Sequence, residues 1–412
     1  MSSAPLPTAP HPATDAAAKR SPGRRGRLLT VGAGAAGLAV LLSACSGGGS
    51  DDGKGGSGTQ AAAPARAEIS VNLKGRQAAA GKPVTVTLAK GDLKEVSVSA
   101  AKGAALTGKV SSDGRTWTSK RVAAPGTAYQ VKATTKEGGS ATAAFTTAAA
   151  AKVNKLTLAP GKGTTVGVGQ PLSIVFDNPV TDKADVERAL KVSTSNDTVG
   201  SWGWIKDYSG RDRIDWRPKD YWRSGTQVRL KADLNGIDSG GGFFVRDYDT
   251  NFTIGAAQIV KVDLATKKLR LERDGKVVNT VPMSAGTPGG DKRSWGGTTV
   301  LMAKEGTIRM NSETVGLGDA YDKMVDHSMR LTWSGMYAHA APWNAAYFGN
   351  ANRSSGCIGM SDSNASWLYG QVRAGDPFEV TGPGHKGVPD AGNGYGAWNL
   401  SWAKWQDLSA LD

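Results

Sequence analysis

Cysteine and histidine are scarce in this 412-residue chain. There are two cysteines, Cys45 and Cys357, and four histidines. Two cysteines cannot build a disulfide framework, a multi-cysteine metal site or an iron–sulfur site. Any thiol or imidazole chemistry must therefore depend on very few side chains, and we expect neither a metal nor a cofactor.

Long apolar runs are also scarce. Residues 28–44 form an uncharged run that is too short and too rich in glycine to be a typical transmembrane helix. The basic stretch 19–27 precedes it, and Leu42-Ser43-Ala44-Cys45 ends it with a small-residue cleavage pattern that resembles a bacterial lipobox. We therefore expect residues 1–44 to be a lipoprotein signal peptide and Cys45 to be lipidated. The alternative is a short uncleaved anchor in which Cys45 is incidental.

Two other patterns lie in the same segment. Arg24-Arg25 is compatible with twin-arginine export, but the surrounding sequence is loose, so the export route stays open. Gly32, Gly34 and Gly37 spell a dinucleotide-binding fingerprint. That motif needs a buried strand before it and a helix after it, whereas here an arginine-rich stretch precedes it and a cleavage site follows. We therefore exclude dinucleotide binding.

Positive charge exceeds negative charge along the chain. The net charge is +14, and because residues 1–44 hold five cations and one carboxylate, the remainder carries about +10. This excess suits a polyanionic cell wall, and it is equally compatible with an ordinary solvated surface. Export and the lack of a basic cluster argue against nucleic-acid binding.

The composition changes twice after Cys45. Residues 45–66 are rich in glycine and serine and are expected to form a flexible tether. From residue 67 onward, short alternating runs with β-branched residues are separated by Gly, Pro and Asp turns, which is typical of an all-β sandwich.

An internal repeat divides this β region. Residues 113–133 and 212–232 align at a constant offset of 99 positions, which places Trp117 on Trp216. The offset is close to the length of an immunoglobulin-like sandwich, so we predict a duplication with two domains, at residues 67–150 and 151–255. The alternative is chance similarity between turn-and-strand sequences.

A third β-rich unit is expected at residues 256–383, with one helix over residues 362–373. The tail, residues 384–412, places Trp398, Trp402 and Trp405 at helical spacing. We favour a helical face that docks on the body of the protein over a sugar-stacking surface.

Cys357 is the candidate nucleophile. It would be the remaining thiol after lipidation of Cys45, and it lies in RSSGCIGMS, a turn that leads towards a helix. The alternative is a buried, inert cysteine. His339 lies upstream in an apolar strand that ends at Pro342, and the spacing is His-x14-Ser-Ser-Gly-Cys. A thiol needs a nearby base or cation to ionise near neutral pH, and His339 is the best candidate.

The other histidines are weaker candidates. His327 lies among charged residues in what the sequence suggests is a solvated loop, and His385 lies in a glycine-rich tail. His11 would leave with the signal peptide. The alternative for His339 itself is a core histidine with satisfied hydrogen bonds.

Residues 334–380 resemble the catalytic motif of the L,D-transpeptidases with the YkuD fold. The segments SG-x-Y-x-HAAPW, SSGCIGMS and NASWLYGQVRAGDPFEV carry the resemblance. The segments ERALKVS, GSWGWI and WRPKDYW resemble the immunoglobulin-like domain that precedes this domain in the actinobacterial enzymes. The resemblance implies a mainly β protein with two immunoglobulin-like β-sandwiches, a YkuD-type β-rich catalytic domain with a short helix, and a C-terminal docking tail.

The resemblance also implies residue roles. Cys357 would be the nucleophile and His339 its activator, with the main-chain carbonyl of Ala340 orienting the imidazole. Chemical reasoning adds that successive main-chain amides of Ser355, Gly356 and Cys357 could receive an oxyanion. Glycine suits such a turn because it tolerates positive φ.

We expect four further residues to bind substrate, namely Ser334, Tyr337, Trp343 and Ser354. Two positions depart from the family pattern. Ser355 stands where the family usually has His, and Gly359 stands where it commonly has Asn or Arg. The Ser355 amide can still serve, whereas Gly359 leaves one side-chain hydrogen bond in doubt.

The implied function is an anchored peptidoglycan L,D-transpeptidase. Cys357 would attack the diaminopimelate carbonyl of a tetrapeptide stem, D-Ala would leave, and the amine of a second stem would resolve the thioester. Water as acceptor would make the enzyme an L,D-carboxypeptidase, and a protein acceptor would make it an attachment enzyme. A non-catalytic wall-binding lipoprotein is the alternative from another class. The expected location is extracytoplasmic, on the membrane through Cys45, facing the wall.

Overall fold

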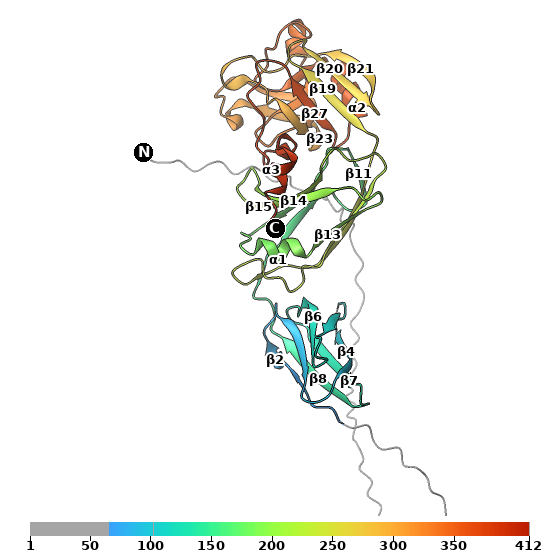
Figure 1. The fold of residues 1–412 in the computed structure, drawn as a ribbon. Coiled ribbons are helices and arrows are strands. Elements are labelled where there is room, and N and C mark those ends of the chain that lie inside the picture. The colour runs from blue at the N-terminus through green and yellow to red at the C-terminus, as the bar shows by residue number, and fades with distance from the viewer. Residues whose placement is uncertain (1–65, 102, 412) are drawn as a thin grey trace, which may run out of the picture. The chain divides into compact units, whose positions relative to one another are not determined.

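The computed structural model describes residues 66–101 and 103–411, so the expected signal peptide and the lipidation site Cys45 lie outside the described residues. The described part is mainly β (Figure 1). Its buried side chains form three separate hydrophobic cores. The expected mainly β fold class is confirmed. None of the helices in this part is long and apolar enough to cross a membrane.

The first sandwich packs two four-stranded sheets. One sheet has the order β1 (Ile69–Val71), β3 (Pro83–Leu88), β6 (Thr116–Val122) and β5 (Gly108–Val110). The other has the order β2 (Gly75–Ala78), β8 (Ser140–Thr147), β7 (Ala128–Thr135) and β4 (Leu93–Ala100). Alternation in β3 turns Val84, Val86 and Leu88 into the core, as the two-residue period of a strand requires.

The second sandwich has two sheets of the same size. One sheet has the order β10 (Leu156–Ala159), β12 (Leu172–Phe176), β15 (Asp212–Pro218) and β14 (Gly200–Lys206). The other has the order β11 (Thr164–Val166), β18 (Tyr248–Ile254), β16 (Gln227–Ala232) and β13 (Leu190–Thr194). The helix α1 (Lys183–Arg188) and the short pair β9 (Lys152–Val153) and β17 (Phe243–Phe244) complete it.

The two sandwiches share one topology, which agrees with the predicted duplication. In each, the second sheet begins with a parallel pair, β2 with β8 and β11 with β18. Trp117 and Trp216 occupy equivalent strands, β6 and β15, and both are buried. Each indole lies over a glycine, Gly108 or Gly200, where an added Cβ would collide with the ring. The glycines are therefore part of the repeated packing.

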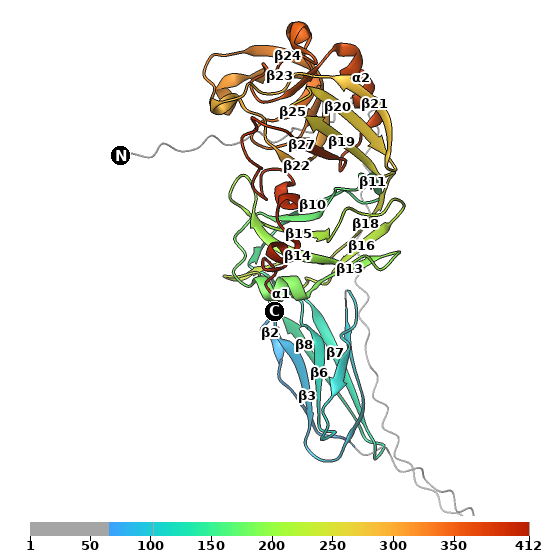
Figure 2. The same ribbon diagram turned by 45° about the horizontal axis from the view of Figure 1, so that its top comes forward.

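The third domain is built from two sheets (Figure 2). The first has the order β21 (Lys276–Pro282), β20 (Lys268–Arg273), β19 (Gln258–Asp263), β27 (Pro377–Thr381) and β22 (Gly297–Val300). The second has the order β23 (Ala303–Asn311), β24 (Asp322–Arg330), β25 (Tyr337–Ala340) and β26 (Ile358–Met360). The connections contain α2 (Asp362–Gln371) and the 3₁₀ helices η1 (Gly290–Lys292), η2 (Ser312–Val315) and η3 (Pro342–Tyr347).

Helix α2 is the helix that the sequence predicts. The hydroxyl of Ser361 caps it by accepting a hydrogen bond from the Asn364 amide at 3.2 Å. Ala365 and Leu368 are buried in the core of the domain. The helix ends before the predicted boundary because Val372 adopts an extended conformation.

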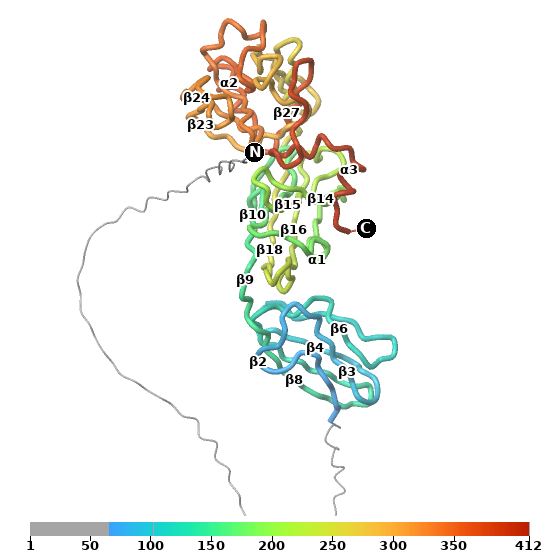
Figure 3. Tube along the Cα trace, turned by 90° about the vertical axis from the view of Figure 1, so that its left-hand side faces the viewer, coloured from blue at the N-terminus to red at the C-terminus, as the bar shows by residue number. Residues whose placement is uncertain are grey.

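The C-terminal tail docks, but not as one helix. The 3₁₀ helix η4 (Gly396–Asn399) and the helix α3 (Trp402–Gln406) are separated by extended backbone at Leu400. The tail lies along β14 (Figure 3). Trp405 is fully buried there, and its Nε1 donates to the carbonyl of Ser201 at 3.0 Å. Gly203 makes room, because a Cβ there would lie 2.8 Å from the indole.

Candidate active site

Adjacent parallel strands bring the two candidate catalytic residues into one region. His339 is on β25, Cys357 immediately precedes β26, and the register pairs Ala338 with Ile358 and His339 with Gly359. The turn at Cys357 therefore leads first into a short strand and only then into α2.

The thiol of Cys357 is buried and neutral. Its side chain is 9% exposed, and Sγ donates to the carbonyl of Gly335 at 3.6 Å. Burial raises the pKa of Cys357 to about 11, although a hydrogen bond from the Tyr337 amide acts in the opposite direction. Near neutral pH this thiol is protonated, so nucleophilic attack requires a base.

His339 is held as a neutral imidazole. It is 6% exposed, and burial lowers its pKa below the ordinary histidine value. Nδ1 lies 2.6 Å from the carbonyl oxygen of Ala340. Because that oxygen can only accept, Nδ1 carries the proton and Nε2 is left as the basic atom. Within the described chain no hydrogen bond joins this ring to Sγ of Cys357, so the two must approach each other for proton transfer.

The other histidines lie in different settings. His327 is in β24, not in the expected solvated loop, and it has φ of 54° where the register of β23 and β24 shifts. Its ring packs edge-on against Tyr369 at 5.6 Å. His385 is exposed after β27, and its Nδ1 accepts from the Gly387 amide at 3.0 Å. His11 lies outside the described residues.

The turn before β26 offers two free amides. Gly356 has φ of +121°, which favours glycine. Its amide donates to Ser354 Oγ at 3.2 Å, and that hydroxyl donates to the carbonyl of Cys357 at 2.5 Å. The amides of Ser355 and Cys357 and the Ser355 hydroxyl have no hydrogen-bond partner in the part of the chain that the structure describes. An oxyanion could therefore be received by the Ser355 and Cys357 amides.

Ser294, which sequence reasoning missed, holds this turn. Its side chain is buried, and Oγ donates to the carbonyl of Gly356 at 2.8 Å and accepts from the Gly286 amide at 2.9 Å. A single serine in the connection between β21 and β22 carries no sequence signal of its own. Only the fold brings it beside the turn that precedes Cys357.

A cavity of about 150 Å³ opens beside the turn. Its walls are formed by Asp291, Arg293, Trp295, Val315, Gly316, Leu317, Tyr321, Ser334, Gly335, Met336, Ser355, Gly356 and Lys386. Of the four residues expected to bind substrate, Ser334 is in this wall, whereas Tyr337, Trp343 and Ser354 are not. The buried Tyr337 instead donates its hydroxyl to Glu305 at 3.1 Å. The tilted indole of Trp343 lies 6.0 Å from the His339 ring.

Two further positions shape the site. Burial, and secondarily the charge that Cys357 carries once it ionises at high pH, raise the pKa of Tyr321 to about 12, so near neutral pH its phenol is a protonated donor in the cavity wall. At Gly359 an added Cβ would lie 2.8 Å from that of Ala341. Any side chain at this departure from the family pattern would require Ala341 to move.

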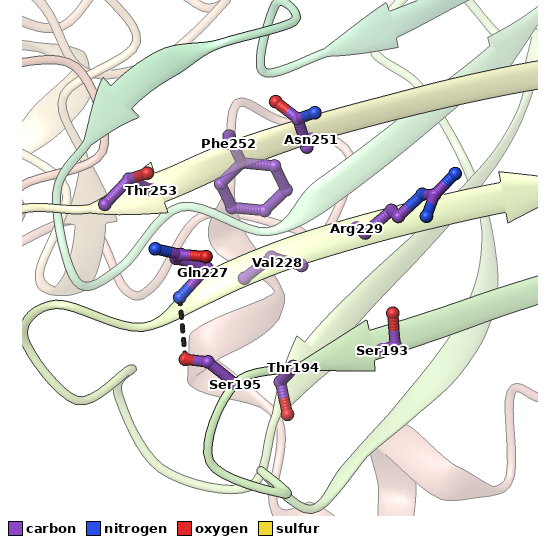
Figure 4. Close-up of a pocket in the computed structure, with 9 residues that line it drawn as sticks. All are labelled: Ser193, Thr194, Ser195, Gln227, Val228, Arg229, Asn251, Phe252 and Thr253. Atoms are coloured by element: carbon purple, nitrogen blue, oxygen red, sulfur yellow. Dashed lines mark hydrogen bonds between the residues drawn. The ribbon is translucent and has the colours of Figure 1, made fainter.

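A larger groove, of about 480 Å³, lies in the second sandwich (Figure 4). It is formed by Ser193, Thr194, Ser195, Gln227, Val228, Arg229, Asn251, Phe252 and Thr253. Strands β13, β16 and β18 carry most of these residues, and the Gln227 amide donates to Ser195 Oγ at 3.0 Å. Neither cavity has Cys357 or a histidine in its wall, but the smaller one includes Ser355 and Gly356, the two residues that precede Cys357, so we take the smaller cavity as the candidate site.

Comparison with known proteins gives consistent matches. Residues 75–238 match a bacterial Ig domain family, and residues 257–380 match the L,D-transpeptidase catalytic domain family. L,D-transpeptidase 2 of Mycobacterium tuberculosis is 33% identical over 332 residues, which is 79% of this chain and 80% of the relative. L,D-transpeptidase 1 of the same organism is 34% identical over 55% of this chain and 84% of its own. A solved structure of the L,D-transpeptidase LdtMt1 in complex with imipenem has 32% identity and a TM-score of 0.48, covering 56% of this chain and 99% of that one.

Proposed function

This chain belongs to the L,D-transpeptidase family, and we propose that it cross-links peptidoglycan stem peptides between two diaminopimelate residues through a thioester on Cys357. The donor is a tetrapeptide stem that ends in D-Ala. The acceptor is the side-chain amine of a second stem.

In the first half of the reaction, the thiol proton passes to Nε2 of His339 while Sγ of Cys357 attacks the diaminopimelate carbonyl. The amides of Ser355 and Cys357 stabilise the oxyanion. The C–N bond to D-Ala then breaks, and the leaving amine takes the proton from the imidazolium of His339. The product is a thioester, with D-Ala released.

In the second half, the acceptor amine attacks the thioester carbonyl. His339 removes a proton from the amine, the new C–N bond forms, the C–S bond breaks, and the thiolate of Cys357 recovers its proton. Water in place of the amine would release a tripeptide stem, which is the L,D-carboxypeptidase outcome.

One arrangement carries this proposal. Cys357 is the free cysteine of the described residues, it adjoins two amides that lack acceptors, and the neighbouring strand β25 carries a neutral imidazole whose Nε2 makes no hydrogen bond in the described part. A nucleophile, a base and oxyanion donors are the parts that acyl transfer requires.

Mass spectrometry of muropeptides tests the product. Purified protein incubated with disaccharide-tetrapeptide should yield a dimer that has lost one D-Ala on forming the cross-link, and Cys357→Ser should yield none. Tripeptide monomers without dimers would show that water is the acceptor and would refute the transpeptidase product. Unchanged substrate would refute acyl transfer altogether.

We also propose that the protein is anchored to the outer face of the cell membrane through a diacylglyceryl group on Cys45. The support is the lipobox-like sequence at residues 42–45, since two acyl chains hold a protein stably where one is marginal. Cys45→Ala should be secreted or remain uncleaved. A Cys45→Ala protein found in membranes at its mature mass would contradict the anchor.

A further inference from the structure

Two cations from separate segments stand on the rim of the cavity beside the nucleophile. Arg293 follows η1, and Lys386 lies in the loop after β27. Neither was singled out by the sequence. Both line the same cavity as the Ser355 and Gly356 backbone, so they lie close to where a bound stem peptide would react.

Hydrogen bonds fix the two segments to each other. The Lys386 amide donates to the carbonyl of Ser294 at 2.8 Å, and Arg293 Nη1 donates to the carbonyl of His385 at 3.4 Å. Ser294 also holds Gly356 through its hydroxyl. The backbone that places these cations is therefore the backbone that positions the oxyanion turn.

An indole supports the Lys386 side chain. Nζ lies 5.2 Å from the centre of the Trp295 ring, which is within the range of a cation–π contact. The ring is itself fixed, because Trp295 Nε1 donates to Ser334 Oγ at 3.0 Å and Asn393 Nδ2 donates to the same hydroxyl at 2.8 Å. The Lys386 side chain therefore packs on an indole ring that hydrogen bonds hold in place at the cavity wall.

The positive charges of Lys386 and Arg293 are not paired with carboxylates of the described chain. Within the described residues, neither Lys386 nor Arg293 has a carboxylate within 4.0 Å. Arg293 uses Nε and Nη1 on the carbonyls of Gly290 and His385, whereas the Lys386 ammonium makes no hydrogen bond in the described part. Asp291 is the one acidic residue among the lining residues, so the rim carries a net positive charge.

We propose that Lys386, with Arg293 beside it, binds a free carboxylate of the stem peptide in this cavity. The inference rests on the proposed function, because it assumes a stem peptide at Cys357. Two carboxylates have the required chemistry, namely that of the terminal D-Ala and that on the diaminopimelate side chain. Lys386 is a substrate-binding residue here and takes no part in the bond-making steps.

Binding to an unreactive protein tests the proposal directly. In the Cys357→Ala background, calorimetry would compare the tetrapeptide stem with two analogues, one amidated at D-Ala and one amidated at the diaminopimelate side chain. Lys386→Gln should weaken binding of the free stem about tenfold, as loss of a charge-assisted hydrogen bond generally does. Lys386→Arg should restore most of it. One amidated stem lacks the carboxylate that Lys386 binds, and this stem should have the same affinity for the Cys357→Ala protein with and without Lys386→Gln. The stem that behaves in this way identifies which of the two carboxylates is bound.

Two further variants act as controls. Lys292→Gln removes an exposed neighbouring cation that does not line the cavity, and it should leave the affinity within about twofold. Asp291→Asn removes the negative charge of the rim and should tighten binding of the free stem. If Lys292→Gln and Lys386→Gln weakened the affinity for the free stem equally, the effect would come from the net charge of the protein, and the proposed carboxylate site would be refuted.

The site is also refuted if Lys386→Gln binds the free stem normally, if no stem binds, or if both amidated stems bind as tightly as the free one. With Cys357 intact, Lys386→Gln should raise KM about tenfold and leave kcat within about twofold. Normal turnover with no affinity difference would refute the carboxylate site alone. An affinity difference without any acylation would refute the proposed reaction and leave the site standing.

Discussion

Ser294 Oγ donates a hydrogen bond of 2.8 Å to the carbonyl oxygen of Gly356, the residue before the nucleophile. The same hydroxyl accepts from the Gly286 amide at 2.9 Å. One buried serine therefore ties two backbone segments together behind the turn. Because the Gly356 carbonyl and the Cys357 amide belong to one planar peptide group, this hydrogen bond fixes the orientation of the Cys357 amide.

Ser294→Ala should slow acylation of Cys357 about tenfold or more, equivalent to about 1.4 kcal/mol in the barrier. It should also lower the free energy of unfolding by about 1–3 kcal/mol, because the buried Gly286 amide loses its acceptor. Stopped-flow acylation by a carbapenem and thermal unfolding measure the two effects. Ser363→Ala, at an exposed position of α2, is the control. Acylation at the normal rate would show that Ser294 does not position the turn.

Ser355→Ala should keep acylation within about tenfold of the normal rate, because the Ser355 hydroxyl makes no hydrogen bond in the described chain and the main-chain amide is retained. Loss of a required oxyanion donor costs about a hundredfold or more. Ser355→His should also be tolerated. Acylation more than a hundredfold slower in Ser355→Ala, with the fold intact and the thiol still accessible to a small reagent, would assign the role to the hydroxyl instead.

The thiol of Cys357 should ionise only well above neutral pH, with its pKa at about 11. A folded-state pKa above the unfolded value makes the folded protein bind the proton more tightly between pH 9 and 11, so stability falls as pH rises through that window. Compared with Cys357→Ala, the protein should lose up to about 3 kcal/mol there. Thiolate absorbance, with the variant subtracted, gives the midpoint. A midpoint at or below pH 8 would mean that the free enzyme already holds a stabilised thiolate.

Asp376 should destabilise the fold when it ionises. It is fully buried, its Oδ1 has no partner in the described part, and burial raises its pKa to about 6. Because the folded state binds this proton more tightly than the unfolded chain, stability falls as pH rises from about 4 to 6. Asp376→Asn should therefore unfold at a higher temperature than the parent at pH 7.5, and the difference should shrink at pH 4.5. Exposed Asp291→Asn is the control. A less stable Asp376→Asn at pH 7.5 would show that the ionised carboxylate is favourable.

The sequence was sufficient for the features that depend on local patterns. Alternation predicted strands such as β3, and the pattern of residues 362–373 predicted α2. The spacing of Trp117 and Trp216 predicted a duplication, with which the common topology of the two sandwiches agrees. His327 was different, because a register shift within a hairpin gives no local sign and its charged neighbours suggested a loop.

Contacts between residues far apart in the chain could not be predicted from the sequence. Trp398, Trp402 and Trp405 suggested one helical face, but all three surround Arg217 of β15, at 4.8, 5.5 and 5.1 Å, from two separate turns. Ser294 and Lys386 are isolated residues in loops, and only the folded chain places Ser294 against the Gly356 carbonyl and Lys386 in the cavity wall. The candidates Cys357 and His339 could be named from motif spacing and from the resemblance, whereas the residues that hold them in place could not.

Intact-mass analysis after incubation with a tetrapeptide stem tests the central claim most directly. The protein should gain the mass of the stem without its D-Ala, peptide mapping should place the adduct on Cys357, and Cys357→Ser should gain nothing. His339→Ala should fold normally and form no detectable adduct on the same timescale, while His327→Ala should react at close to the parent rate. An adduct on another residue, or a His339→Ala protein that acylates as fast as the parent while His327→Ala does not, would contradict the assignment of Cys357 and His339.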